Sequence, residues 1–210
     1  MTTRSKLVLL GLTATLLMGL AVSSASAGRL SISNSRVRFT WSPLTFRSTE
    51  DFIVSLLVRC PVTFEGSFHS ATIQKVNRSL IGYISRATAN SGACTGGRVT
   101  FLQEQLPWHI TFEGFTGALP LITAIRLLIR RHATLIEASG LTCLYTETGA
   151  SKTRMSVSLG AGGVVTGAEY LPEFTIPSMT GFPCSGAIRP EGTASVTLLG
   201  NTSAITIRLI

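Results

Sequence analysis

The sequence predicts an all-β fold, an antiparallel β-sandwich of immunoglobulin-like or jelly-roll-like character that is stapled by disulfides and contains little helix. Three observations support this prediction. Apolar and polar residues alternate with a period of two along most of the chain. Clusters of Gly, Pro, Asn and Ser separate the alternating segments at intervals of roughly 8 to 12 residues. Four cysteines occur in a chain whose first residues are typical of export. A closed barrel is the less favoured alternative for the same strand pattern.

The N-terminal segment has the parts of a cleavable signal peptide. Two basic residues precede an apolar run from Leu7 to Val22, and Ala25-Ser26-Ala27 supplies small residues for a signal peptidase. Because the run is shorter than the roughly 20 residues that span a bilayer, we favour cleavage over retention as an anchor. We therefore expect a signal peptide at residues 1–27 and a single β-sandwich domain at residues 28–210. The product is expected to be secreted or held at the cell surface, with no integral membrane segment after cleavage.

The longest alternating segment runs from Val54 to Phe68. Its even-numbered residues are almost all apolar, whereas polar residues such as Arg59 occupy odd positions, so one face of this strand is expected to be buried. Pro61 has no amide proton, which predicts a bend, a break or an edge there. The other clear strands are predicted at residues 37–41, 108–112, 125–129, 153–159, 193–199 and 204–210.

Two segments are ambiguous between strand and helix. Residues 80–92 fit a short helix as readily as a strand. Residues 125–139 show the same ambiguity, although their Ile, Leu and Thr runs favour strand.

The four cysteines predict two disulfides, because paired cysteines are the usual form in exported proteins. Three connectivities are possible. We favour the sequential one, Cys60 with Cys94 and Cys143 with Cys184, because it closes loops of moderate length around local groups of strands. In the chain-entropy account each bridge stabilises the fold by roughly 3 to 4 kcal/mol.

The sequence Thr-Phe-Glu-Gly occurs twice, at residues 63–66 and 111–114, each time near a histidine. The alternation buries the phenylalanines and places four polar residues on the opposite faces of the two strands: Glu65, His69, His109 and Glu113. If these strands are neighbours, the cluster could bind zinc together with His132. Zinc needs three or four converging ligands, so we favour exposed cross-strand pairs and assign no metal or other cofactor.

Gly66 and Gly114, which end the two copies, each predict a β-bulge or a place where a side chain packs over the backbone. The surrounding residues diverge at once, so no longer repeat is inferred.

Motifs of the common enzyme classes are absent from the sequence, and no catalytic residue is assigned. The chain contains no G-x-S-x-G, H-E-x-x-H, C-x-x-C or G-x-x-x-x-G-K. Residues 159–163 are glycine-rich but lack the spacing of a dinucleotide site, and they predict a turn. Paired glutamates of a glycoside hydrolase are the remaining catalytic possibility, with Glu65 and Glu113 best placed by the alternation.

Large aromatic residues divide into two groups. Trp41 and Trp108 alternate in phase with apolar residues, so we expect both in the core. Tyr145 and Tyr170 are left as candidates for surface contacts.

The chain is basic, with 18 Lys and Arg against 10 Asp and Glu and a formal net charge of +8. Loss of residues 1–27 removes two cations and no anions, which leaves 16 against 10, or +6. This balance favours anionic partners such as a cell-wall polymer, an acidic glycan or lipid headgroups. Nucleic acid is not expected, because no Lys/Arg run is longer than Arg130-Arg131 and no basic helix is visible.

Several motifs in the first half of the predicted domain resemble one group of proteins. They are EGSFH, LIGYISRA, CTGG, LPWH and FTGALP, which lie between Glu65 and Pro120, together with Lys75. In these motifs the chain resembles uncharacterised exported β-rich proteins of GC-rich Gram-positive bacteria of the actinobacterial type. The resemblance implies export and a bacterial source, and it implies no activity, cofactor or ligand.

Taken together, these features favour an exported, non-catalytic binding or structural protein outside the cell or at its surface. Two alternatives remain open. One is a secreted hydrolase, acting on glycans through glutamates or through a histidine-bound metal. The other is a subunit of a surface assembly, because residues 204–210 could pair with a strand of another chain.

Overall fold

The computed structural model describes residues 29–49, 56–147, 153–171, 175–180, 182–184 and 186–210. The predicted signal peptide lies outside the described residues. Within them the chain forms sixteen strands and three short 3-10 turns. The strands are β1 (Arg29–Ile32), β2 (Arg36–Ser48), β3 (Leu57–Phe68), β4 (Thr72–Gln74), β5 (Leu80–Ala89), β6 (Arg98–Phe101), β7 (Trp108–Ala118), β8 (Leu121–Arg130), β9 (Ala133–Ala138), β10 (Leu141–Thr146), β11 (Thr153–Leu159), β12 (Val165–Tyr170), β13 (Ile176–Pro177), β14 (Ala187–Glu191), β15 (Thr193–Leu198) and β16 (Ile207–Leu209). The 3-10 turns are η1 (Ser91–Ala93), η2 (Gln103–Gln105) and η3 (Ala161–Gly163).

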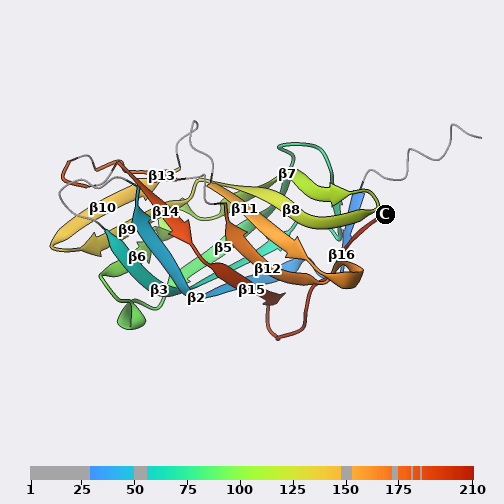
Figure 1. Cartoon of the computed structure of the whole chain (residues 1–210), viewed down its shortest axis with the longest axis horizontal. Coiled ribbons are helices and arrows are strands. Elements are labelled where there is room, and N and C mark those ends of the chain that lie inside the picture. The colour runs from blue at the N-terminus through green and yellow to red at the C-terminus, as the bar shows by residue number, and fades with distance from the viewer. Residues whose placement is uncertain (1–28, 50–55, 148–152, 172–174, 181, 185) are drawn as a thin grey trace, which may run out of the picture.

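Eight of these strands close into a barrel (Figure 1). In chain order they are β2, β3, β5, β7, β8, β11, β12 and β15, and each pairs antiparallel with the next. The last strand, β15, pairs back with β2 and closes the ring. The predicted antiparallel all-β class is therefore confirmed, but the predicted sandwich architecture is wrong. A sandwich leaves two sheets with open edges, whereas here the first and last strands of one sheet meet.

β2 bends in its middle, and its two halves pair with different strands on one side. Its first half pairs with β15 and its second half with β14, which carries β13 at its outer edge. Between the halves the register with β3 shifts, since Trp41 is opposite Val62 whereas Leu44 is opposite Cys60. Pro61 lies opposite this bulge, but its carbonyl accepts a hydrogen bond from the Asn90 amide on the other side. Its missing N–H therefore faces the point where β5 has ended, at Ala89. β3 accordingly runs through Pro61 without a break.

The two ambiguous segments are strands. Residues 80–89 form β5, followed by η1, and residues 125–138 belong to β8 and β9 with a turn between them. Both lie in sheets whose pairing satisfies their backbone hydrogen bonds, and this tertiary pairing overrides local spacing.

Aromatic side chains fill the barrel. Trp41, Phe64 and Trp108 are fully buried, and successive ring centroids lie 5.0 and 5.3 Å apart in edge-to-face contacts. The indole nitrogen of Trp41 donates a hydrogen bond to the Gly192 carbonyl (3.1 Å), between β14 and β15. The predicted core positions of Trp41 and Trp108 are thus confirmed.

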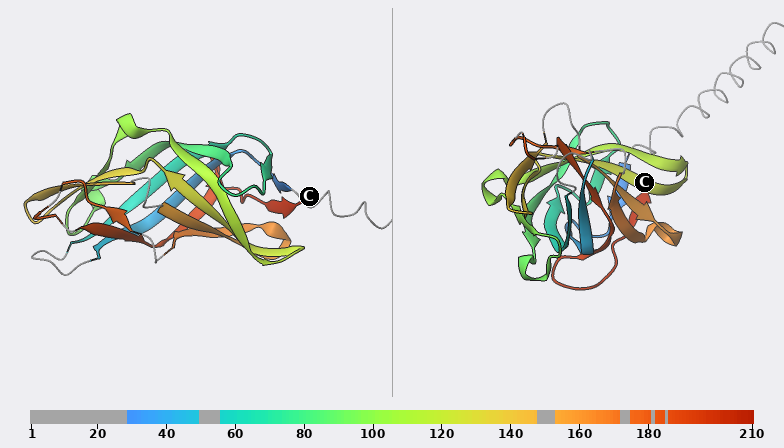
Figure 2. Two further views of the ribbon diagram at one scale, coloured as in Figure 1. Left: turned by 90° about the horizontal axis from the view of Figure 1, so that it is seen from above. Right: turned by 60° about the vertical axis from the view of Figure 1, so that its left-hand side comes forward.

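Small three-stranded sheets cover the two ends of the barrel (Figures 1 and 2). The sheet β10–β9–β6 lies at one end, and the sheet β16–β1–β4 lies at the other, beside the C-terminus. β16 is the predicted C-terminal strand, and it pairs with β1 over Leu30 to Ile32.

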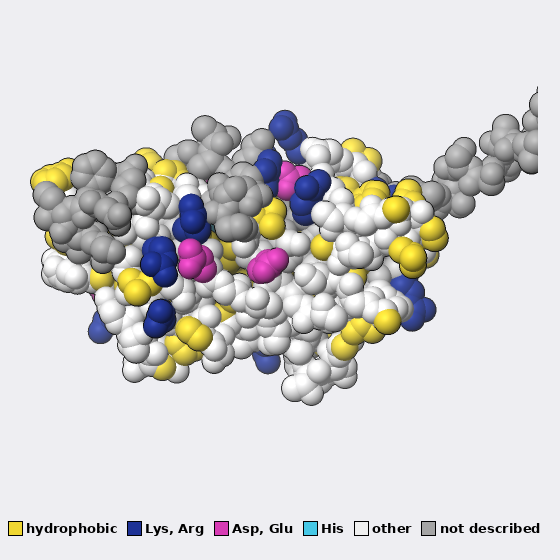
Figure 3. Space-filling view, viewed as in Figure 1, with side chains coloured by type: hydrophobic (Ala, Val, Ile, Leu, Met, Phe, Trp, Pro, Cys, Tyr) yellow, Lys and Arg dark blue, Asp and Glu magenta, His cyan; other side chains and the backbone are white. Residues whose placement is uncertain are grey.

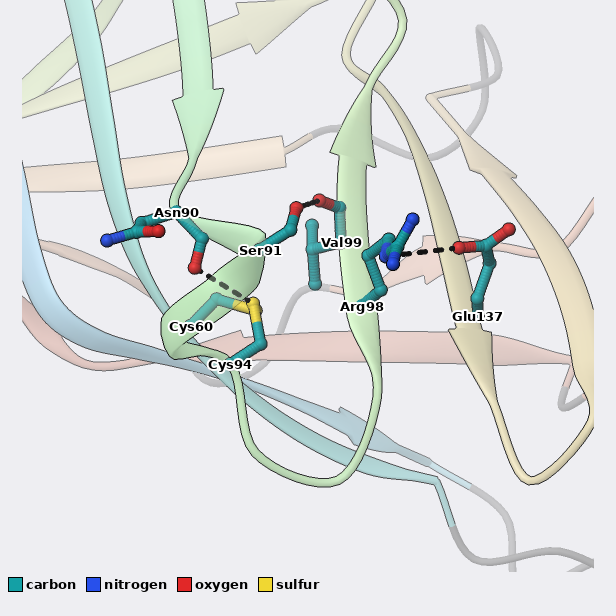
Figure 4. Close-up of a disulfide and its surroundings, with 7 residues drawn as sticks. All are labelled: Cys60, Asn90, Ser91, Cys94, Arg98, Val99 and Glu137. Carbon is teal, nitrogen blue, oxygen red and sulfur yellow. Dashed lines mark hydrogen bonds and ion pairs between the residues drawn. A yellow bond between two sulfur atoms is a disulfide. The ribbon is translucent and has the colours of Figure 1, made fainter.

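Both disulfides lie at the β10–β9–β6 end, with the predicted sequential connectivity. Cys60 of β3 is bonded to Cys94, which directly follows η1 (Figure 4). Cys143 of β10 is bonded to Cys184. Each bridge ties a strand to a neighbouring connection, so together they fasten the covering sheet to the barrel wall.

Candidate binding surface on the barrel wall

On the outward faces of β2, β3 and β5, here called the arginine wall, most of the charged residues are arginines. These strands contain five arginines, namely Arg36, Arg38, Arg47, Arg59 and Arg86, and one acidic residue, Glu65. All six side chains occupy positions that alternate with the buried residues of the same strands. Glu191 of the adjoining β14 adds a second carboxylate, 3.6 Å from Arg47. The wall therefore has a local excess of positive charge.

A row of hydroxyl side chains crosses the arginine wall at right angles to the strands. Thr40 is opposite Ser195 on one side and Thr63 on the other, and Thr63 is opposite Thr88. Side chains directly opposite one another in antiparallel strands lie about 5 Å apart. These four residues, the hydroxyl row, thus form a continuous polar strip over β15, β2, β3 and β5.

The row beside it is ionic. The guanidinium of Arg38 donates two hydrogen bonds to Oε1 of Glu65, from Nε at 3.0 Å and from Nη2 at 2.8 Å. Nη1 of Arg86 lies 3.8 Å from the other carboxylate oxygen. The Glu65 side chain is 17% exposed, whereas that of Arg86 is 66% exposed. Arg38 therefore holds the carboxylate, and Arg86 projects into solvent with only a loose ion pair.

A shallow hollow of about 440 Å³, the wall hollow, opens along the hydroxyl row on the side of the β2 bulge. Its lining includes three members of the hydroxyl row, Thr40, Thr63 and Thr88, and also Arg86 and Asn90. The volume is within the range of small-molecule sites. Hydroxyl, amide and guanidinium groups together suit a hydroxylated anionic ligand, such as an acidic sugar unit.

The two predicted histidines lie on either side of one tyrosine. Tyr83 of β5 is opposite His109 of β7, and its ring centroid lies 5.2 Å from that of His109 and 4.7 Å from that of His69. Both contacts are edge-to-face. His69 is exposed, whereas Tyr83 and His109 are half-buried. The structure therefore joins the histidines through an aromatic ring instead of through a shared ligand position.

Glu65 and Glu113 do not approach each other. Glu65 is opposite Arg86, whereas Thr111, two residues before Glu113, is opposite Leu80 at the far end of β5. At about 3.3 Å per residue the two carboxylates are about 20 Å apart along the strand direction. Glycoside hydrolysis requires a separation of roughly 5 to 10 Å. Glu113 instead forms an ion pair with Arg154 of β11.

His132 takes no part in the wall. It is 1% exposed and lies among core aromatics, with its ring centroid 4.4 Å from that of Trp108. Burial lowers its pKa from 6.5 to about 3, so the ring is neutral at physiological pH. The proposed third histidine of a zinc site therefore points away from the other two. In the part of the chain that the structure describes, no three His, Cys, Asp or Glu side chains are grouped to hold a metal.

Tyr145 and Tyr170, the two candidates for surface contacts, are both in the core. Tyr145 is fully buried and Tyr170 is 5% exposed. Tyr170 stacks on Trp41, with ring centroids 5.7 Å apart. Burial raises the pKa of the Tyr145 hydroxyl to about 12, which keeps it protonated. Period-two alternation assigns a side chain to one of two faces, but barrel closure and the covering sheet decide which face is buried.

The glycines of the two Thr-Phe-Glu-Gly segments lie at bulges, as predicted. The register between β3 and β5 shifts at Gly66, and that between β7 and β8 shifts at Gly114. A Cβ on Gly66 would meet the Tyr83 carbonyl oxygen at 2.2 Å, whereas one on Gly114 would meet the Arg126 side chain at 3.1 Å. Residues 159–163, predicted as a turn, end β11 and form η3.

The hydroxyl row and Arg86 were not singled out from the sequence. Each is an ordinary polar residue of an alternating strand, and only the pairing of β15 with β2 brings Ser195 beside Thr40. The sequence signal that exists is the run of Thr and Arg on the polar faces of β2 and β3. It has no distinguishing spacing.

A scan against protein-family models, a search of curated proteins and a search of solved structures each found no match. Within the described residues, no helix has the length and apolarity needed to cross a membrane.

Proposed function

We propose that this chain is an exported, non-catalytic protein that binds an anionic cell-wall polymer or acidic glycan along its arginine wall. The observation that carries the proposal is the wall hollow, in which three threonines from neighbouring strands lie beside the exposed guanidinium of Arg86. The two disulfides are compatible with an oxidising location outside the cell.

The chemistry of the wall fits a repeating anionic ligand. Threonine hydroxyls and the Asn90 amide can donate to and accept from sugar hydroxyls, and an arginine can bind a carboxylate or phosphate through two parallel hydrogen bonds. Arg86 can turn toward such a group at little cost, because Glu65 keeps its two hydrogen bonds from Arg38. The other arginines of the wall add long-range attraction along an extended polymer.

A binding role is better supported than hydrolysis. Both glutamates of the predicted pair are already held by arginines, Glu65 by Arg38 and Glu113 by Arg154. Their separation along the strands favours structural ion pairs over a shared catalytic task.

Arg86→Gln tests the wall hollow. The exported, oxidised protein is sedimented with purified Gram-positive wall material at low and high salt, and it is titrated with polygalacturonate and with neutral dextran. Retention by wall material and by polygalacturonate should weaken with salt, and Arg86→Gln should lower the affinity about tenfold, because it removes a charge-assisted hydrogen bond.

Arg98→Gln is the matched control. Arg98 lies on β6, is 65% exposed and forms one loose ion pair of 3.7 Å with Glu137, which closely resembles the situation of Arg86 (Figure 4). This control should change the affinity less than twofold. Equal losses in the two variants, or no retention at either salt concentration, would contradict the proposal.

A further inference from the structure

The end of the barrel that carries β16 exposes large apolar side chains. Leu119 and Leu121, at the tip of the β7–β8 hairpin, are 49% and 79% exposed, and Ile210, which follows β16, is 51% exposed. A hollow of about 370 Å³ opens between this hairpin, η3 and β16, and its lining includes Leu121, Ile122 and Leu209. We call this surface the apolar end. Exposed leucines at a protruding tip are unfavourable in water and mark a surface that docks.

Among the described residues, the apolar end has no acidic side chain. Its segments are residues 29–36, 69–79, 116–124, 159–166 and 198–210, and all ten acidic residues of the chain lie outside them. The same segments carry five cations: Arg29, Arg36, Lys75, Arg78 and Arg208. In Figure 3 hydrophobic atoms gather at the right-hand end with cationic side chains near them, and the visible acidic side chains lie towards the middle.

Two of these cations adjoin the apolar residues directly. Arg208 donates a hydrogen bond from Nε to the Gly162 carbonyl (3.0 Å) and lines the hollow. The backbone amide of Ile210 donates to the Arg29 carbonyl (3.1 Å), so Arg29 adjoins the exposed Ile210. Apolar tips and positive charge therefore occupy one end of the molecule.

We propose that the apolar end docks onto the surface of an anionic lipid bilayer, with Leu119 and Leu121 inserted at the headgroup level and the cations against lipid phosphates. Leucines without cations would suit a protein partner equally well, and cations without leucines would suit a soluble polyanion. The combination, with acidic side chains excluded, is the complement of an anionic membrane surface.

Vesicle flotation tests this docking. The exported, oxidised protein is mixed with phosphatidylcholine vesicles that contain either no anionic lipid or one third phosphatidylglycerol, and mass spectrometry establishes whether residues 1–27 are present. The protein should float with the anionic vesicles, and less so as salt rises. Leu119→Ser/Leu121→Ser should lower the partition coefficient about tenfold or more, because two apolar side chains no longer leave water.

Met179→Ser/Phe182→Ser is the matched control, since these residues are 58% and 79% exposed but lie in the connection between β13 and β14, outside the segments of the apolar end. It should leave flotation unchanged. Three results would overturn the proposal. They are no flotation with anionic vesicles, equal losses in the two double variants, and a dimer in sedimentation that needs Leu119 and Leu121 while vesicle binding is absent. The last would assign the surface to a second copy of the chain.

Discussion

His132 shows how a titratable residue is accommodated inside this barrel. It lies between β8 and β9, and its Nε2 is 3.0 Å from the Thr134 hydroxyl, which is itself fully buried. The ring also makes an edge-to-face contact with Trp108. Desolvation penalises the imidazolium form, so the folded protein keeps a neutral ring and its pKa falls to about 3.

The buried imidazole predicts acid sensitivity. Above pH 6.5 the ring is neutral in both the folded and the unfolded chain. As the pH falls from 6.5 towards 3, the unfolded chain binds a proton that the folded protein does not, so the free energy of unfolding decreases by up to about 1.4 kcal/mol per pH unit. Urea unfolding between pH 4 and 7 should show this loss.

His132→Gln isolates the effect, because it removes the titration and can still hydrogen-bond to Thr134. As the pH falls, the free energy of unfolding of the wild type should decrease more than that of the variant. A difference that stays constant from pH 7 to pH 4 would mean that the folded protein also binds the proton.

At the scale of the element, the two Thr-Phe-Glu-Gly segments each place a glycine at a β-bulge of a barrel strand. Each glycine lies where a barrel strand shifts its register against a neighbour. The surroundings of the two glycines differ. Gly66 faces backbone atoms of β5, and in return a Cβ on Gly82 of β5 would meet the Ser67 carbonyl oxygen at 2.4 Å. Gly114 instead faces the movable end of the Arg126 side chain.

Gly66→Ala and Gly114→Ala should therefore differ in effect. The methyl group at position 66 meets a carbonyl oxygen that cannot move without breaking the β3–β5 ladder, so we expect a loss of about 2 kcal/mol or more. At position 114 the guanidinium can shift, and the reduced freedom of the unfolded chain offsets the contact, so the change should stay within about 1 kcal/mol. Urea unfolding of both variants checks this, and equal losses would contradict it.

At the scale of the whole molecule, the barrel separates two surfaces of different chemistry. The arginine wall lies on the outward faces of β2, β3 and β5, and the apolar end lies where the hairpins and β16 meet. A protein docked on a bilayer by its end would present its wall sideways to polymer above the membrane. The residues tested for each proposal, Arg86 for the wall and Leu119 with Leu121 for the end, are different, so either proposal can fail without the other; Arg36 alone belongs to both surfaces.

This separation predicts that the two binding activities are independent. Arg86→Gln should weaken polymer binding and leave vesicle flotation unchanged, whereas Leu119→Ser/Leu121→Ser should do the reverse. Parallel titration and flotation of the same preparations measure both effects. Loss of both activities in either variant would mean that one surface, or the stability of the whole fold, is responsible.

The sequence by itself determined the strands and the faces of most of their residues. Alternation is a local property, so it correctly predicted the buried side of β3, the core positions of Trp41 and Trp108 and the bulges at Gly66 and Gly114. The favoured disulfide connectivity was also correct, and the bridges close loops of moderate length between cysteines 34 and 41 residues apart.

Only the tertiary structure decided how the strands are joined. Period-two alternation is the same in a sandwich and in a barrel, and the closing contact brings Ser195 beside Thr40, which is 155 residues away. That contact and the covering sheets also decided that Tyr145, Tyr170 and His132 are buried and that the hydroxyl row is continuous. Cross-strand neighbours depend on register and long-range pairing, and these are set by the packing of the whole barrel and not by any local pattern.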